Sequence, residues 1–183
     1  MNIPTHIASG ACIAYALAIK LQGRAGAAWQ RGLLAVCALA LGLISHLLLD
    51  LLPHYAWVVH LNWFRPLPFH WLMREAVLGL AVAIPAFVFA GRSWPYVALG
   101  MFGGIYPDVE KVLSVDFRVP DTFILFAWHS NHLSNRTAGL PKPLLIGIEC
   151  VLIAGFLLAM WRMRRAASGK DVDTLVSPAA DAG

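Results

Sequence analysis

The chain has 183 residues, of which 59% are hydrophobic and 13% are charged, with a formal net charge of +4. Soluble domains carry about 25% charged residues, so this composition excludes an ordinary soluble protein and indicates a membrane protein. The positive charge does not indicate nucleic-acid binding, because the basic residues are scattered through short loops and after the last apolar segment.

Residues 5–10 lead into the apolar run from Ala11 to Leu21, which gives a first span of roughly 17 residues, and Pro4 can occupy the first turn of its helix. The N-terminus lacks the basic region and the small-residue cleavage site of a signal peptide, so we expect this segment to be retained. The link from Gln22 to Arg31 contains arginines and no acid. It is therefore predicted to be a cytoplasmic loop.

Later apolar segments extend this pattern to about five transmembrane helices. They cover residues 32–52, 71–90, 94–106 and 144–161, with a tight turn predicted at 91–93. The sequence thus predicts an all-α integral membrane protein. Its single transmembrane helical domain spans residues 1–165, and residues 166–183 form a disordered cytoplasmic tail.

This topology places the histidines toward one membrane face. Some of them form a histidine-rich loop region on the extracytoplasmic side. The seven histidines of the chain are His6, His46, His54, His60, His70, His129 and His132. The arginines after the last apolar segment are typical of a cytoplasmic stop. We therefore expect a multi-pass protein of a bacterial-type inner (plasma) membrane whose site faces the extracytoplasmic side.

A metal site is indicated by the residues that interrupt the second apolar segment. His46 and Asp50 are spaced i, i+4, which places them on one helix face a turn apart. His129 and His132, spaced i, i+3, can point to one metal from a helical turn. We predict that a divalent metal, zinc first and manganese or iron as alternatives, is held by His6, His46, Asp50, Asp108, His129 and His132.

Four side chains are expected to take part in chemistry at that metal. Asp108 and Glu75 are candidates for proton transfer. Arg74 and Arg136 are candidates for holding an anionic group.

Each residue also has a structural alternative. His46 can make a hydrogen bond between helices, and His6 can anchor a helix end at the membrane surface. Asp50 can pair with Arg74 or cap a helix, and Asp108 can be the N-cap of a short helix. The two histidines of the loop can simply be solvated.

Short motifs resemble a known family, the predicted membrane-bound metal-dependent hydrolases of the YdjM type. The motifs are Pro4-Thr5-His6-Ile7-Ala8-Ser9-Gly10, Gly42-Leu43-Ile44-Ser45-His46-Leu47-Leu48-Leu49-Asp50, Tyr106-Pro107-Asp108-Val109-Glu110 and His129-Ser130-Asn131-His132. The resemblance implies a small multi-span metal hydrolase whose metal set is the one given above. Glu110 and Lys111 replace the acid and the histidine that end the family's Pro-Asp turn, which leaves one metal as an alternative to two.

Together these patterns predict a membrane-bound metal-dependent hydrolase. Its partners would be the membrane and a phosphate ester or lipid-linked phosphate substrate at the membrane surface. One alternative is a membrane di-iron oxygenase of the desaturase or hydroxylase kind. Another is a non-enzymatic metal or proton transporter with His46, Asp50 and Glu149 along its path.

Overall fold

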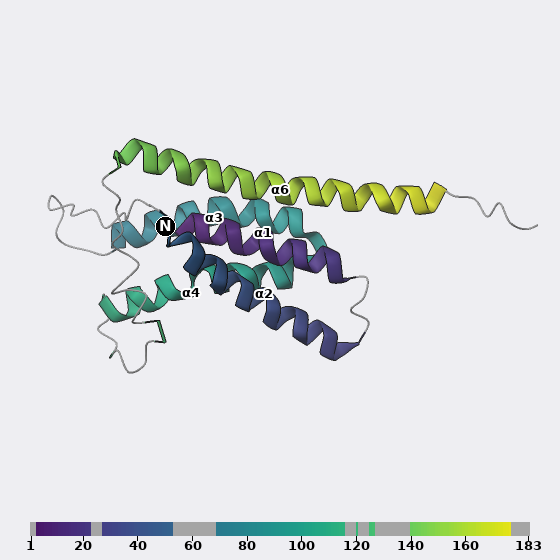
Figure 1. Ribbon diagram of the computed structural model, residues 1–183, viewed down its shortest axis with the longest axis horizontal. Coiled ribbons are helices and arrows are strands. Elements are labelled where there is room, and N and C mark those ends of the chain that lie inside the picture. The colour runs from purple at the N-terminus through teal and green to yellow at the C-terminus, as the bar shows by residue number, and fades with distance from the viewer. Residues whose placement is uncertain are drawn as a thin grey trace, which may run out of the picture.

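A computed structural model describes residues 3–22, 27–52, 69–115, 120, 125–126 and 140–176. Nearly all of these residues are helical (Figure 1). The helices are α1 (Ile3–Gln22), α2 (Ala28–Leu49), α3 (Phe69–Ala90), α4 (Trp94–Val115) and α6 (Lys142–Val176), with the 3-10 turn η1 (Gly91–Ser93) between α3 and α4. No strand occurs in the described part of the chain, so the prediction of an all-α protein is confirmed there.

Three described stretches are long and apolar enough to cross a membrane. They are Ala28–Leu49, Met73–Glu110 and Pro143–Ser168. The second contains most of α3 and α4 and turns back on itself at η1. Large apolar side chains such as Val36, Val77 and Val151 are exposed on these helices, as lipid-facing residues are. A membrane protein is therefore supported, while the number of five spans stays a prediction.

Helix α1 is not among those stretches, and its position gives the reason. It contacts α2, α3, α4 and α6, and it lies in the middle of the bundle in Figure 1. Its small residues Ala8, Ala11, Ala14 and Ala18 are completely buried, which lets the neighbouring helices approach closely. The first turns of α1 are buried among other helices, so they can carry polar side chains.

The turn between α3 and α4 is the tight one that the sequence predicts at Gly91-Arg92-Ser93. Gly91 adopts φ +52°, in the left-handed region that glycine enters without a steric penalty. The turn returns the chain alongside α3, and Val82 and Val97 from the two arms join Tyr15 of α1 in one hydrophobic core. This hairpin fixes the position of α4 against α1.

Gly100 determines how closely α4 packs against α1. A Cβ added at Gly100 would clash with the carbonyl oxygen of Gly10 and with the side chain of Ala14. The absence of a side chain thus brings the two backbones together, as small residues do between membrane helices. The C-terminal half of α4 consequently lies against the first turns of α1.

Two helices extend further than the sequence indicates. We expect the helix that begins at residue 94 to end at residue 106, but α4 continues through the buried Pro107 to Val115. Helix α6 continues to Val176, into the stretch from residue 166 that we expect to be disordered. Proline removes only one backbone hydrogen bond, and packing of α4 against α1 and α2 outweighs that loss.

Candidate metal centre

Three helices bring metal-capable side chains to the same end of the bundle. His6 lies in the first turn and a half of α1, His46 near the end of α2, and Asp108 in the second half of α4. Asp50 is the C-cap residue of α2. These parts of the helices meet at the end where the N-terminus is marked in Figure 1.

Asp50 lies between the two histidines. Its Oδ1 is 3.1 Å from Nε2 of His6 and its Oδ2 is 3.4 Å from Nε2 of His46. Oδ2 of Asp108 is 3.9 Å from Nε2 of His6. Neighbouring ligand atoms of a tetrahedral zinc ion lie roughly 3.3 to 3.6 Å apart, given bonds of about 2.0 to 2.2 Å. The separations in this cluster, which run from 3.1 to 3.9 Å, bracket that range.

The two imidazole rings stack on one another. Their centroids are 3.8 Å apart and the planes are inclined by 26°. One ligand atom from each of His6, His46 and Asp108 lies within 4.8 Å of the others. His6 and His46 are completely buried, and the Asp108 side chain, 18% exposed, is the member nearest to the surface.

The backbone of α4 orients His46. Its Nδ1 lies 2.6 Å from the carbonyl oxygen of Gly104. A carbonyl oxygen only accepts hydrogen bonds, so we assign a proton to Nδ1. The other ring nitrogen, Nε2, faces the Asp50 carboxylate. A hydrogen bond from the far nitrogen to a backbone carbonyl is the usual support of a metal-binding histidine.

His6 has no such partner. Its Nδ1 makes no hydrogen bond within the described residues, and the same holds for Oδ2 of Asp108 and Oγ1 of Thr5, while its Nε2 faces Oδ1 of Asp50. A buried polar atom without a partner costs about 1 to 3 kcal/mol. A cation between Nε2 of His6 and the two carboxylates would remove this cost for Asp108. The donor set of imidazole nitrogen and carboxylate oxygen suits zinc, manganese or iron.

No family model, curated protein or solved structure matches this chain. The resemblance to YdjM-type hydrolases therefore stays a prediction.

The predicted metal ligands divide into two groups. His6, His46, Asp50 and Asp108 lie together, whereas His129 and His132 are outside the described residues, as is Arg136. Complete burial is incompatible with His6 as a surface anchor. Asp108 lies inside α4 and is not the N-cap of a short helix.

The structural alternatives for His46 and Asp50 are compatible with a metal site. His46 does make a hydrogen bond between helices through Nδ1, while its Nε2 faces Oδ2 of Asp50. Asp50 does cap α2, but through its backbone, whose N–H donates to the carbonyl oxygen of His46. Its carboxylate oxygens face the histidines.

The two predicted catalytic residues of α3 lie side by side. Nη2 of Arg74 donates to Oε1 of Glu75 at 3.1 Å. Glu75 is buried, and its Oε2 has no hydrogen-bond partner within the described residues. Its charge is close enough to that of Asp108 for the two to interact.

Sequence analysis does not reveal the role of Glu110. Its carboxylate is buried and accepts the backbone N–H groups of Leu125 at 3.3 Å and Phe126 at 2.7 Å. The side chain of Tyr106 packs edge-on against the ring of Phe126. Glu110, which replaces the second acid of the family's turn, therefore ties a distant segment to α4 half a turn beyond Asp108. In the sequence, this role is indicated only by the position of Glu110 two residues after the predicted ligand Asp108.

Proposed function

We propose that this protein is a membrane-bound metal-dependent hydrolase that acts on a phosphate ester or lipid-linked phosphate. His6, His46 and Asp108 hold a divalent cation, with Asp50 between the two histidines. The proposal rests on one observation: two buried imidazoles and two carboxylates, contributed by three helices, face each other at one end of the bundle. A divalent cation at the centre of this group would compensate the charge of the two carboxylates.

The cation supplies Lewis acidity and lowers the pKa of a water ligand toward about 7. Glu75 receives the proton through Oε2, since its other oxygen is held by Arg74. The Arg74 side chain, 32% exposed, binds the phosphate group of the substrate. In this proposal His129, His132 and Arg136 complete the site from the outer loop.

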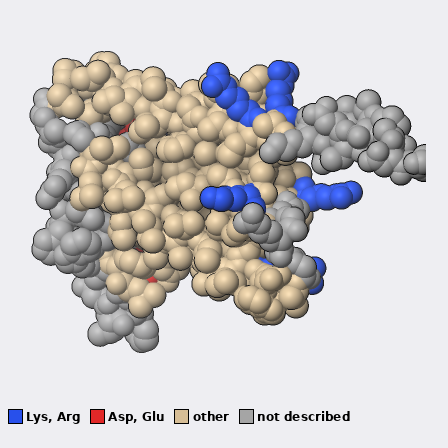
Figure 2. Space-filling model, turned by 45° about the vertical axis from the view of Figure 1, so that its right-hand side comes forward, with Lys and Arg blue, Asp and Glu red and all other residues tan. Residues whose placement is uncertain are grey.

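The distribution of charge supports an extracytoplasmic site. Basic side chains gather toward one end of the bundle in Figure 2, and those at helix ends or turns away from the cluster include Lys20, Arg31 and Arg92. The metal cluster lies at the other end. By the positive-inside rule, the basic end faces the cytoplasm of a bacterial-type inner membrane.

Metal content and hydrolysis of the purified protein test this proposal. Wild type should retain close to stoichiometric zinc or manganese and hydrolyse phosphatidic acid or a chromogenic phosphate ester. His6→Ala and His46→Ala should lose both properties. The matched control is Cys37→Ala, which removes another metal-capable side chain from α2 and should retain both.

Glu75→Gln separates metal binding from catalysis. It should retain the metal and lower kcat about 100-fold, the usual effect of losing a general base. Iron with no hydrolysis would instead favour an oxygenase. Absence of metal from a folded wild type would favour a transporter, and either result would overturn the proposed function.

A further inference from the structure

A groove lies between the beginning of α2 and the beginning of α4. Its lining includes Arg31 and Leu34 of α2, Arg92 of η1, and Tyr96 and Leu99 of α4, and its volume is about 360 Å³. We call it the Arg31–Arg92 groove. Arg31 precedes His46 by about 22 Å of helix, given a rise of 1.5 Å per residue. The groove is therefore separate from the metal cluster.

The lining combines two kinds of chemistry. Two guanidinium groups come from different elements and both are exposed, while the walls below them are formed by Leu34, Leu99 and the ring of Tyr96. No acidic side chain lines the groove in the described part of the chain. A ligand that fits must carry negative charge at one end and an apolar body at the other.

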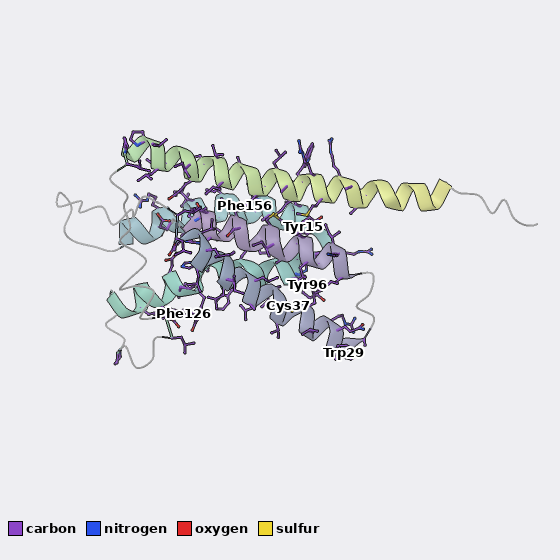
Figure 3. The ribbon with its side chains drawn as sticks, viewed as in Figure 1. Tyr15, Trp29, Cys37, Tyr96, Phe126 and Phe156 are labelled. Carbon is purple, nitrogen blue, oxygen red and sulfur yellow. The ribbon has the colours of Figure 1, made fainter. Side chains whose placement is uncertain are left out.

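Tryptophans indicate the depth of the groove in a bilayer. Trp29 at the start of α2 and Trp94 at the start of α4 are both exposed at this end. Figure 3 shows Trp29 and Tyr96 toward the same end of the bundle. Exposed tryptophans of membrane helices lie at the level of the lipid headgroups. Arg31 and Arg92 would thus meet lipid phosphates, with the exposed Leu33 and Val36 of α2 along the acyl chains.

From this we infer that the Arg31–Arg92 groove binds an anionic phospholipid. Its phosphate lies between the guanidinium groups of Arg31 and Arg92, and an acyl chain follows the apolar surface of α2 and α4. Charge complementarity favours a lipid with net negative charge over a zwitterionic one. The apolar walls favour a lipid over free phosphate. The inference is independent of the chemistry proposed at the metal cluster.

Lipid retention by the full-length protein tests this inference. The protein is incubated in detergent with phosphatidylglycerol or phosphatidylcholine, and bound lipid is counted by native mass spectrometry. The wild-type protein should retain more phosphatidylglycerol than phosphatidylcholine. At about 1 kcal/mol per arginine, the double variant Arg31→Gln/Arg92→Gln should bind it about 30-fold more weakly.

The matched control is Arg162→Gln/Arg165→Gln, which removes the same charge from α6 at the same end of the bundle. This control should retain phosphatidylglycerol as wild type does. An equal loss in both double variants would mean that only the general surface charge attracts lipid, and this would overturn the inference. A further variant, Ala35→Phe, keeps both arginines but fills the groove with a phenylalanine side chain.

Ala35→Phe should also lose the bound lipid, and full retention by this variant would overturn the inference. Circular dichroism verifies that each variant is folded. Inorganic phosphate is added as a competitor and should not displace the lipid at concentrations that leave the fold intact. Displacement by phosphate alone would identify an anion site and would likewise overturn lipid binding.

Discussion

The imidazole rings of His6 and His46 stack with their centroids 3.8 Å apart, and the Asp50 carboxylate reaches both of them. Each oxygen of Asp50 faces a different ring. The stack joins α1 to α2, and the hydrogen bond from His46 to Gly104 joins α2 to α4. The cluster is therefore a contact between three helices as well as a candidate metal centre.

Metal should stabilise the folded protein through this contact. Zinc at about 100 times its dissociation constant should add about 2.7 kcal/mol to the free energy of unfolding, because only the folded chain assembles the ligands. The midpoint of thermal unfolding of chelator-treated protein, followed by tryptophan fluorescence, should rise on addition of zinc. In His6→Ala the rise should be lost, whereas Cys37→Ala should behave as wild type. An equal rise in His6→Ala would show that zinc binds elsewhere.

Close packing at Gly100 should be sensitive to a single methyl group. Gly100→Ala pushes α4 away from Gly10 and Ala14, with a cost of about 1 to 3 kcal/mol in unfolding free energy. It should also weaken metal binding, since α4 carries both Asp108 and Gly104. Both effects are measured by thermal unfolding with and without zinc.

Gly147→Ala is the matched control for Gly100→Ala, because nothing lies within 4 Å of a Cβ at that position of α6. This change should increase stability by about 0.4 to 1 kcal/mol, since alanine favours the helix and restricts the unfolded chain. If the two alanines destabilised the protein equally, close packing at Gly100 would not be the cause.

Removal of Glu110 should release the segment that it holds. Glu110→Ala leaves the N–H groups of Leu125 and Phe126 without their acceptor, at a cost of about 1.5 to 3 kcal/mol for each bond to a charged group. Amide hydrogen exchange at Phe126 should become faster. Glu110→Gln keeps one acceptor oxygen and should show a smaller effect. Unchanged exchange in Glu110→Ala would contradict the anchoring role.

The orientation of the bundle can be measured independently of the metal site. A fluorescent protein that matures only in the cytoplasm, fused after residue 183, should fluoresce, because the basic end of α6 is expected to be cytoplasmic. Alkaline phosphatase fused at the same position should be inactive, since it requires the periplasm. The opposite pair of results would place the metal cluster on the cytoplasmic side.

Much of the local structure is predictable from the sequence. Apolar runs, Pro4 and Gly91 predict the helices and the turn at 91–93, because these signals act within a few neighbouring residues. The spacing of His46 and Asp50 also predicts that they share a helix face, and the two side chains lie 3.4 Å apart. The prediction that the helix ends at residue 106 is wrong. A proline usually marks a helix boundary, but Pro107 is buried inside α4.

The sequence by itself determined the helical segments and the polar residues near one set of helix ends, because periodicity and spacing are local properties of the chain. Only the tertiary structure decided that His6 is buried against His46, that Gly104 orients His46, and that Glu110 holds Phe126. These contacts join residues far apart in the chain. They depend on how closely α1, α2 and α4 approach, and the packing of those helices around Gly100 sets that distance.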